Sequence, residues 1–332
     1  MKQLTISIAA YNVENTLEQT LKSMNDERVL DDLEVLIIDD GSKDNTYKIA
    51  EKYQKIAPQT FKYIKKKNGG HGSTINKGIE LATGKYFKVV DGDDWVDTET
   101  LVTFINSLKS LNSDLVLTNH VEVFPDRIKK ISLIQGMVPN KEYSWKSDID
   151  VKRVVLHNLT VKTELLKANH VKITEHCFYV DVEFVIWAAY ISKTITYLDI
   201  FLYQYRLGEE EQSVAKKSML KNVDMQEKVA YKLVSLFDKF YKQGFLSSNQ
   251  EKTIFNTYKR SVGSTMRTFL LMKPKEARKR IIHFDKKINN VSTHSYKSLE
   301  KDKFIHLIRM GNYSLIPLAK ILYRIWVLKY GY

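Results

Sequence analysis

Short apolar runs and helical repeats alternate along the first hundred residues. The segments "LTISIAAY", "LEVLIID", "FKYIKK" and "KYFKVV" are apolar or rich in β-branched residues, and each predicts a strand. Between them, apolar residues recur at helical spacing, as in the face of Ile49, Tyr53 and Ile56. The segment "STINKGIELATG" predicts a helix that ends at Gly84, where we expect a positive φ. Strands that alternate with single helices require crossovers, so the pattern predicts an α/β fold with a mainly parallel sheet.

Polar or glycine-rich segments follow all four predicted strands. In chain order they read "AAYNVEN", "DDGSKDNT", "KKNGGHGS" and "DGDDWVD". Ligands of open parallel sheets bind at the carboxyl ends of the strands. We therefore expect the four segments to meet at one edge of the sheet and to form a site there.

The pattern changes twice further along the chain. Residues 115–214 mix the predicted strands "DLVLTNHVEVF" and "KTITYLDIFLYQYR" with a helical "VDVEFVIWAAYIS", whereas the chain from residue 215 onward is helical, with Val229, Leu233 and Phe237 on one face. We therefore divide the chain into three parts, which are residues 1–114, 115–214 and 215–332.

Positive charge is concentrated in the last of these parts. Residues 215–332 hold 25 Lys and Arg against 8 Asp and Glu, a balance of +17, while the preceding residues hold 27 against 31, or −4. Such a tail suggests an anionic partner, either a phospholipid surface or a nucleic acid. The basic residues are dispersed along amphipathic helices without a known nucleic-acid-binding motif, so no specific nucleic acid is expected, and a nucleic-acid-binding protein is kept as an alternative class.

The end of the chain, "SLIPLAKILYRIWVLKYGY", is apolar and aromatic but interrupted by lysine and arginine. It is too short and too charged for a transmembrane span, which needs about 20 apolar residues. It either packs on the body of the protein, lies on a membrane surface or forms a homodimer. The single cysteine, Cys177, excludes an internal disulfide, and no signal-peptide pattern is present. We expect a cytoplasmic protein with peripheral contact to the inner face of the membrane.

A cluster of carboxylates follows the fourth predicted strand. Asp91, Asp93, Asp94 and Asp97 fall within seven residues. Because burying unpaired carboxylates is costly, they need water or a cation, and Mg²⁺ is commonly held by one or two carboxylates together with substrate phosphates. The alternative is a solvated turn in which Asp97 merely caps the next helix.

Four segments, in order and spacing, resemble the nucleotide-sugar-binding half of the family 2 glycosyltransferases, which have the GT-A fold: "SIAAYNVENTL", "LIIDDGSKDNT", "KNGGHGSTINKGIELATGKY" and "VVDGDDWVD". Further on, "FYVDVEFVIW" is similar to the family's base-bearing segment, and "LYQYRLGEEEQSV" to the Tyr-x-Tyr-Arg stretch that often follows it. The resemblance covers roughly residues 3–214. It implies a nucleotide-sugar-binding half at 1–114, an acceptor-binding half at 115–214 and a basic helical region at 215–332.

The resemblance implies a donor pocket lined by residues of three loops, namely Ala9, Tyr11, Asn12, Asp40, Asn68 and Gly70. The first three would form the edge against which the nucleotide base lies. Asp40 would accept a hydrogen bond from that base, while Asn68 and Gly70 would line the same pocket.

The resemblance also implies the chemical roles. Asp91 would face the ribose or the metal and Asp93 the metal and the diphosphate, with Asp94 as a third candidate ligand for Mn²⁺ or Mg²⁺. Asp181 would be the general base, and Arg206 would balance diphosphate charge. The implied reaction is a single displacement with inversion, from a nucleotide diphosphate sugar, expected to be a UDP-sugar, to a hydroxyl of a glycan or lipid-linked acceptor.

Two departures from the family pattern change this picture. The common Ala-Arg-Asn is here "TIN" at 74–76, so one usual cation is missing, and Lys66, Lys67 or His71 is expected to replace it. The common Glu-Asp pair is here "VD" at 180–181, which leaves Asp181 as the expected base, with Glu183 close in sequence. These departures keep a non-catalytic nucleotide-sugar-binding or scaffold protein as an alternative. We expect His157 to have only a structural role, because its spacing is not that of a metal ligand.

Overall fold

The computed structural model describes residues 1–151, 153–208, 212–213 and 215–330. The chain divides into two compact units. The first unit comprises Met1–Gly208 together with Ser247–Thr253, and the second comprises Glu209–Leu246 together with Ile254–Tyr332. The motif "LYQYRLGEEEQSV" includes 209–211 and 214, which lie outside the described residues.

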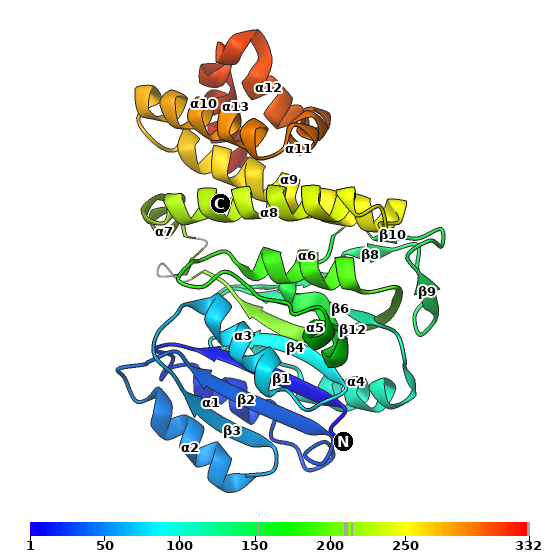
Figure 1. Ribbon diagram of the computed structural model, residues 1–332. Helices are drawn as coiled ribbons and strands as arrows, with labels where there is room; N and C mark the ends of the chain where they lie inside the picture. The colour runs from blue at the N-terminus through cyan, green and yellow to red at the C-terminus, as the bar shows by residue number, and fades with distance from the viewer. Residues whose placement is uncertain (152, 209–211, 214, 331–332) are drawn as a thin grey trace. The chain divides into compact units, whose positions relative to one another are not determined.

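The first unit contains a ten-stranded mixed sheet (Figure 1). Its strand order is β3-β2-β1-β4-β11-β6-β12-β5, with β7 paired to β6 and β9 paired to β12. The strands are β1 Leu4–Ala10, β2 Leu33–Asp39, β3 Phe61–Lys65, β4 Tyr86–Asp91, β5 Trp95–Val96, β6 Leu115–Val123, β7 Ile128–Ile131, β9 Glu142–Ser144, β11 Leu159–Lys162 and β12 Thr194–Arg206, and a small separate sheet joins β8 Ile134–Gln135 to β10 Asp150–Val151.

The first four strands run parallel to one another, as the alternation of strands and helices predicts. β1 pairs in parallel with both β2 and β4, and β2 pairs in parallel with β3. Their carboxyl ends therefore share one edge of the sheet. The reversal of strand order at β1 makes this edge the expected place for a ligand.

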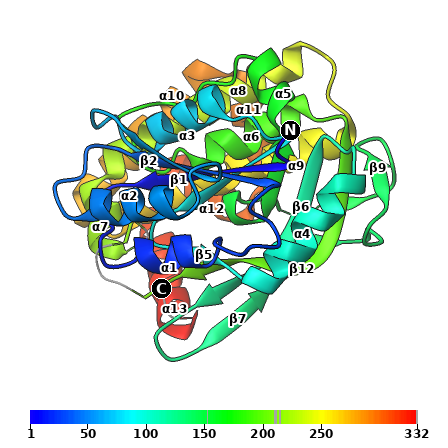
Figure 2. The same ribbon diagram turned by 90° about the horizontal axis from the view of Figure 1, so that it is seen from below.

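Helices cover both faces of this sheet. The helices of the first unit are α1 Leu17–Lys22, α2 Thr46–Ile56, α3 His71–Leu81, α4 Thr98–Ser110, α5 Thr163–Ala168 and α6 Asp181–Ile191, with a 3-10 turn η1 at Leu156–Asn158. Apolar residues of α1, α2 and α4 share one core with Ile6 and Ile8 of β1. On the other face, Gly78 of α3 lies against Ser7. Figure 2 shows α1 and α3 on opposite sides of β1.

Gly84 does not end a helix with a positive φ, contrary to what we expected from the sequence. The helix α3 ends at Leu81, and Gly84 does not adopt a positive φ. A Cβ at Gly84 would instead lie 2.6 Å from the backbone nitrogen of Thr5. The turn needs glycine because the neighbouring strand is too close for any side chain.

All the regular elements that the structure describes in the second unit are helices. Its elements are α7 Lys216–Lys221, α8 Val223–Lys242, α9 Ser248–Leu270 (whose first turns belong to the first unit), α10 Pro274–Val291, α11 Thr293–Ser298, the 3-10 turn η2 Leu299–Lys301, α12 Lys303–Tyr313 and α13 Ile316–Tyr330. The predicted apolar face of α8 is buried, as shown by Val229, Leu233 and Phe237. Among the described residues, we find no helix with the length and apolar character that crossing a bilayer requires.

Glu34 is a buried charge that ties together the edge of the sheet opposite the predicted site. Its carboxylate accepts hydrogen bonds from Thr5 Oγ1 at 2.7 Å, from Thr83 N at 2.8 Å and from Lys62 Nζ at 2.6 Å. Burial alone would raise the pKa of Glu34, but these partners outweigh burial and lower the pKa below its ordinary value of 4.5. The ionised form therefore stabilises the fold.

We predict that Glu34→Gln lowers the free energy of unfolding by about 1–3 kcal/mol at neutral pH, because buried donors lose a charged acceptor. The folded-state pKa is the lower one, so this stabilisation is present above pH 4.5 and is lost as the pH falls through the folded-state value. Urea unfolding of both proteins from pH 7 downward should show their difference shrinking in acid. The control Glu80→Gln, at an exposed residue paired with Lys77, should change stability by less than about 0.5 kcal/mol.

Candidate active site

The loops that follow the first four strands meet at one edge, as predicted. The backbone nitrogen of Asp40 donates to Ala10 O at 2.8 Å, and that of Gly92 donates to Ala9 O at 3.0 Å. The backbone nitrogen of Lys66 donates to Asp39 O at 2.9 Å. These bonds connect the ends of β1, β2, β3 and β4 into one continuous surface.

The end of β1 and the loop after it contain three of the predicted donor-pocket residues. Ala9 lies next to the last residue of the strand, Tyr11 has 49% of its surface exposed, and Asn12 has φ 53°. The Asn12 side-chain oxygen accepts from Lys43 N at 2.9 Å, and its backbone nitrogen donates to Ser42 Oγ at 3.0 Å. The loop after β1 is thus fixed to the loop after β2, and the Tyr11 side chain is half-exposed.

Asp40, Asn68 and Gly70 lie together, as the resemblance implies. The Asp40 carboxylate accepts from Gly69 N at 2.9 Å and from Gly70 N at 2.7 Å, and Asn68 Nδ2 donates to Asp40 O at 2.9 Å. Lys66 Nζ lies 2.6 Å from the same carboxylate. Asp40 therefore organises the glycine-rich loop, and Lys66, one of the three expected replacement cations, neutralises Asp40.

His71, the second of those cations, contacts the carboxylate cluster. Its Nε2 lies 2.9 Å from Asp91 Oδ1. Burial alone would lower the pKa of His71, but the charges of Asp91, Asp181 and Asp93 outweigh burial and raise it. Burial would likewise raise the pKa of Asp91, but His71 holds it below its ordinary value. These shifts favour an imidazolium–carboxylate ion pair at the end of β4.

Asp94 is held by two residues of β12. Tyr203 donates its hydroxyl to Asp94 Oδ2 at 2.6 Å, and Arg206 N donates to Asp94 Oδ1 at 2.7 Å. Burial, together with the charges of Asp93 and Asp91, raises the pKa of Asp94 well above its ordinary range. These hydrogen bonds fix the carboxylate in a place where its charge is unfavourable unless a cation is near.

Arg206 lies beside the same cluster. Its Nε donates to Asp93 O at 2.8 Å, its Nη2 donates to Gln19 Oε1 at 2.6 Å, and its guanidinium stacks over Trp95 at 4.9 Å from the ring centre. The sequence places this arginine far from the aspartates, and β12 brings it back because β5, just after the cluster, pairs with β12.

Asp97 caps a helix, which is the role that we considered for it as the alternative to cation binding. Its side chain accepts from Thr100 N at 2.9 Å and caps α4. Of the four clustered carboxylates, Asp97 is thus accounted for by helix capping. Asp91, Asp93 and Asp94 therefore remain as the candidate metal ligands of the cluster.

His157, which we expected to be structural, joins this cluster. Asp91, Asp94 and His157 each offer a ligand atom within 4.8 Å of the others, and Asp93 is not part of that group. Burial, followed by the charge of His120, lowers the pKa of His157 to about 3, so its imidazole is neutral and able to bind a metal. Two carboxylates and a neutral imidazole fit Mn²⁺ well. The sequence carries no signal of this grouping, because His157 lies in η1, more than 60 residues after the aspartates in the chain.

Asp181 is the first residue of α6. Burial is the main cause that raises its pKa, the charge of Asp91 adds to it, and His71 opposes it. The nearby Glu183 is fully buried, and its Oε2 accepts from Thr174 N and Oγ1, both at 3.1 Å. Glu183 therefore holds the loop before α6, and Asp181 is the carboxylate of this segment that shares an electrostatic environment with Asp91.

The first two turns of α3, which follow the glycine-rich loop, interlock with the segment before α6, and no local pattern in the sequence predicts this contact. Asn76 Nδ2 donates to Ile173 O and Glu175 Oε1, both at 2.9 Å, and Asn76 Oδ1 accepts from Ile173 N at 2.8 Å. A Cβ at Gly72 would lie 2.0 Å from Thr174 O. The helix that follows the glycine-rich loop thus also fixes the segment that leads to Asp181.

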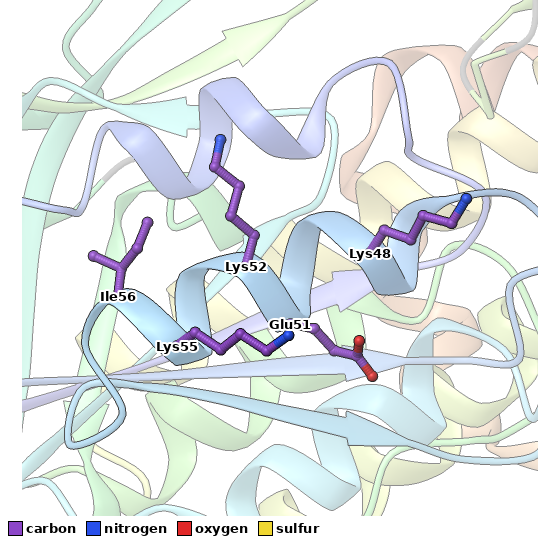
Figure 3. Close-up of a pocket in the computed structure, with 5 residues that line it drawn as sticks. All are labelled: Lys48, Glu51, Lys52, Lys55 and Ile56. Carbon is purple, nitrogen blue, oxygen red and sulfur yellow. The ribbon is translucent and has the colours of Figure 1, made fainter.

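The hollow drawn in Figure 3 is separate from this cluster. Its lining residues, all from α2, are Lys48, Glu51, Lys52, Lys55 and Ile56. Their side chains spread along the surface of the helix, and Lys52 is paired with Glu18 at 2.7 Å. The convergence of loops, rather than this hollow, defines the candidate active site.

A mostly parallel sheet flanked by helices, with carboxylates and a glycine-rich loop at its carboxyl edge, is an architecture suited to nucleotide-linked ligands. The chain matches the model of glycosyl transferase family 2 over residues 5–177. It belongs to this family.

Individual relatives agree with this assignment. The chain is 27% identical to the putative glycosyltransferase EpsH of Bacillus subtilis (strain 168), over 61% of this chain and 60% of that protein. It is 25% identical to the cholesterol galactosyltransferase of Borreliella burgdorferi, over 80% of this chain and 82% of that protein. The crystal structure of S. aureus TarS 1–349 in complex with UDP-GlcNAc is similar with a TM-score of 0.70 at 20% identity, over 98% of this chain and 92% of that one, which confirms the predicted GT-A fold.

We predict that Asn76→Ala loosens the segment before α6. The backbone nitrogen and oxygen of Ile173 and the carboxylate of Glu175 all lose their hydrogen bonds to the Asn76 side chain. Hydrogen–deuterium exchange of residues 172–178 should accelerate by about tenfold or more, which corresponds to roughly 1.4 kcal/mol of lost local stability. The control Asn169→Ala removes a single exposed bond to Leu165 O and should leave that segment protected. Equal exchange in both variants would contradict the interlock.

Proposed function

We propose that this protein is a metal-dependent, inverting glycosyltransferase that moves a sugar from a nucleotide diphosphate to an acceptor hydroxyl. The observation that carries the proposal is the grouping of Asp91, Asp94 and His157 at the carboxyl edge of a family 2 sheet, with Asp181 in the same electrostatic environment. A bound cation would relieve the unfavourable charge of Asp94 and would have Asp91 as a second carboxylate ligand.

Asp181 is proposed as the general base. A base that accepts a proton from an acceptor hydroxyl works best when its pKa lies nearer the working pH than that of an ordinary aspartate. Burial raises the pKa of Asp181 in that direction. The expected reaction is attack by the acceptor oxygen on the anomeric carbon from the face opposite the nucleotide, which inverts the anomeric configuration.

Asp91, Asp94 and His157 are proposed to hold a divalent ion, Mn²⁺ or Mg²⁺, with Asp93 as a further candidate ligand beside them. The imidazole of His157 favours Mn²⁺. When bound, such an ion stabilises the negative charge that develops on the diphosphate leaving group. His71 and Arg206 are proposed to bring positive charge to the same diphosphate, in place of the missing arginine of the family pattern.

The donor is proposed to be a UDP-sugar, bound along Ala9, Tyr11 and Asn12 with its base toward Asp40, Asn68 and Gly70. The similar TarS structure is a complex with UDP-GlcNAc, which supports this choice of nucleotide. The acceptor is proposed to be lipid-linked or a glycan precursor. The similarity to a cholesterol galactosyltransferase, which spans most of both chains, supports a lipid acceptor.

We predict that UDP binds with Mn²⁺ and that chelation or Asp94→Ala weakens UDP binding at least about tenfold, because the diphosphate charge loses its counter-ion. Calorimetric titration with UDP, GDP and CMP, with Mn²⁺ or a chelator, measures this. The matched control is Asp97→Ala, which removes the helix cap of α4. It should cost about 1 kcal/mol of stability and leave nucleotide binding unchanged. Binding that is indifferent to the metal would overturn the metal proposal.

We predict that Asp181→Asn lowers turnover at least about 100-fold while UDP binding stays within about twofold, because the variant removes the base and not the donor pocket. Release of UDP from a panel of UDP-sugars measures turnover, and proton NMR of the product should show the inverted anomer. The control Glu164→Gln, an exposed first-turn carboxylate of α5, should keep full activity. A retained anomer would refute single displacement, and a wild-type protein that binds UDP without turnover on any donor would favour the non-catalytic alternative.

A further inference from the structure

We propose that α13 docks the protein onto the surface of an anionic lipid bilayer. The inference goes beyond the proposed transfer reaction, because it concerns a helix of the second unit and depends on no residue of the candidate active site. Figure 2 shows α13 in red.

This helix has two apolar faces. One is buried, as Ile316 and Ala319 show, with 3% and 1% of their surface exposed. The other is the outer stripe, whose members are 42–56% exposed and lie at positions i, i+3, i+4, i+7 and i+8 of the helix: Leu318, Ile321, Leu322, Ile325 and Trp326. The spacing places all five on one side of the helix.

The outer stripe is unfavourable in water. Single exposed apolar residues are ordinary, but a contiguous apolar stripe on a helix indicates a surface that binds something. Trp326 adds a ring of the kind enriched at membrane–water interfaces. An apolar stripe on a helix that also carries exposed positive charge fits a helix that lies in the plane of the membrane interface.

Charge selects the occupant of the stripe. Arg324 is exposed on the same helix, and residues 215–332 carry a balance of +17. Anionic phospholipids attract such a surface. A second copy of this chain would instead bring two equally positive regions together, which disfavours a dimer through the same stripe. The lipid surface is therefore the occupant that satisfies both the apolar and the charged residues.

The test uses the full chain and vesicles, without nucleotide or acceptor. We expect the protein to co-sediment with vesicles of phosphatidylcholine and phosphatidylglycerol, and less with phosphatidylcholine alone. The double variant Ile321→Ser/Ile325→Ser should bind at least about tenfold more weakly, because two half-exposed aliphatic side chains no longer enter the interface. Arg324→Gln should weaken binding about fivefold and only on the anionic vesicles.

The matched control is Ile56→Ser/Ile128→Ser, which changes two isoleucines of the first unit that are 54% and 68% exposed. It should bind as the wild type does, and circular dichroism should show that all variants keep their helix content. Equal binding by both double variants, or no binding of the wild type to anionic vesicles, would overturn the proposal. So would light scattering that shows a wild-type dimer converted to monomer by Ile321→Ser/Ile325→Ser. Since the assay measures no sugar transfer, its outcome is independent of whether the proposed reaction is correct.

Discussion

The repulsion among carboxylates at the end of β4 is the constraint around which the first unit is organised. Asp91 and Asp94 are held together by partners that come from distant parts of the chain. His71 arrives at the start of α3, and Tyr203 arrives on β12, which β11 and β6 separate from β4 in the sheet. The short strand β5, which follows the cluster, brings Tyr203 to Asp94, because Val96 of β5 pairs with Tyr203. Without these partners, the buried charges would oppose folding.

Each of three cationic side chains around the site has its own partner. Lys66 is committed to Asp40, His71 to Asp91, and Arg206 to the backbone of Asp93. A histidine in this place differs from an arginine in one physical respect, since its charge depends on the carboxylates that surround it. The pKa of His71 is raised by Asp91, Asp181 and Asp93 against the effect of burial, so these aspartates favour the charged form of the imidazole.

Local patterns in the sequence predicted the parallel strands and the convergence of their loops, because strand and helix periodicity and loop polarity are properties of short segments. They did not reveal His157, which reaches the cluster through the packing of η1, or the interlock of Asn76 with Ile173. Such contacts join segments far apart in the chain, and no spacing rule encodes them. Gly84 shows a further limit. The sequence indicated that a glycine is required there, but it could not distinguish a positive φ from a lack of room for a side chain.

The contact between α3 and the segment before α6 links the glycine-rich loop to Asp181. The Asp40 carboxylate accepts hydrogen bonds from the amides of Gly69 and Gly70, and α3 begins at the next residue, His71. Asn76 of this helix binds the segment before Asp181. A displacement of the start of α3 would therefore also displace the segment before α6, because Gly72 packs against Thr174 with no room even for a Cβ. The same close packing thus couples the position of the start of α6, where Asp181 lies, to the glycine-rich loop that Asp40 orders.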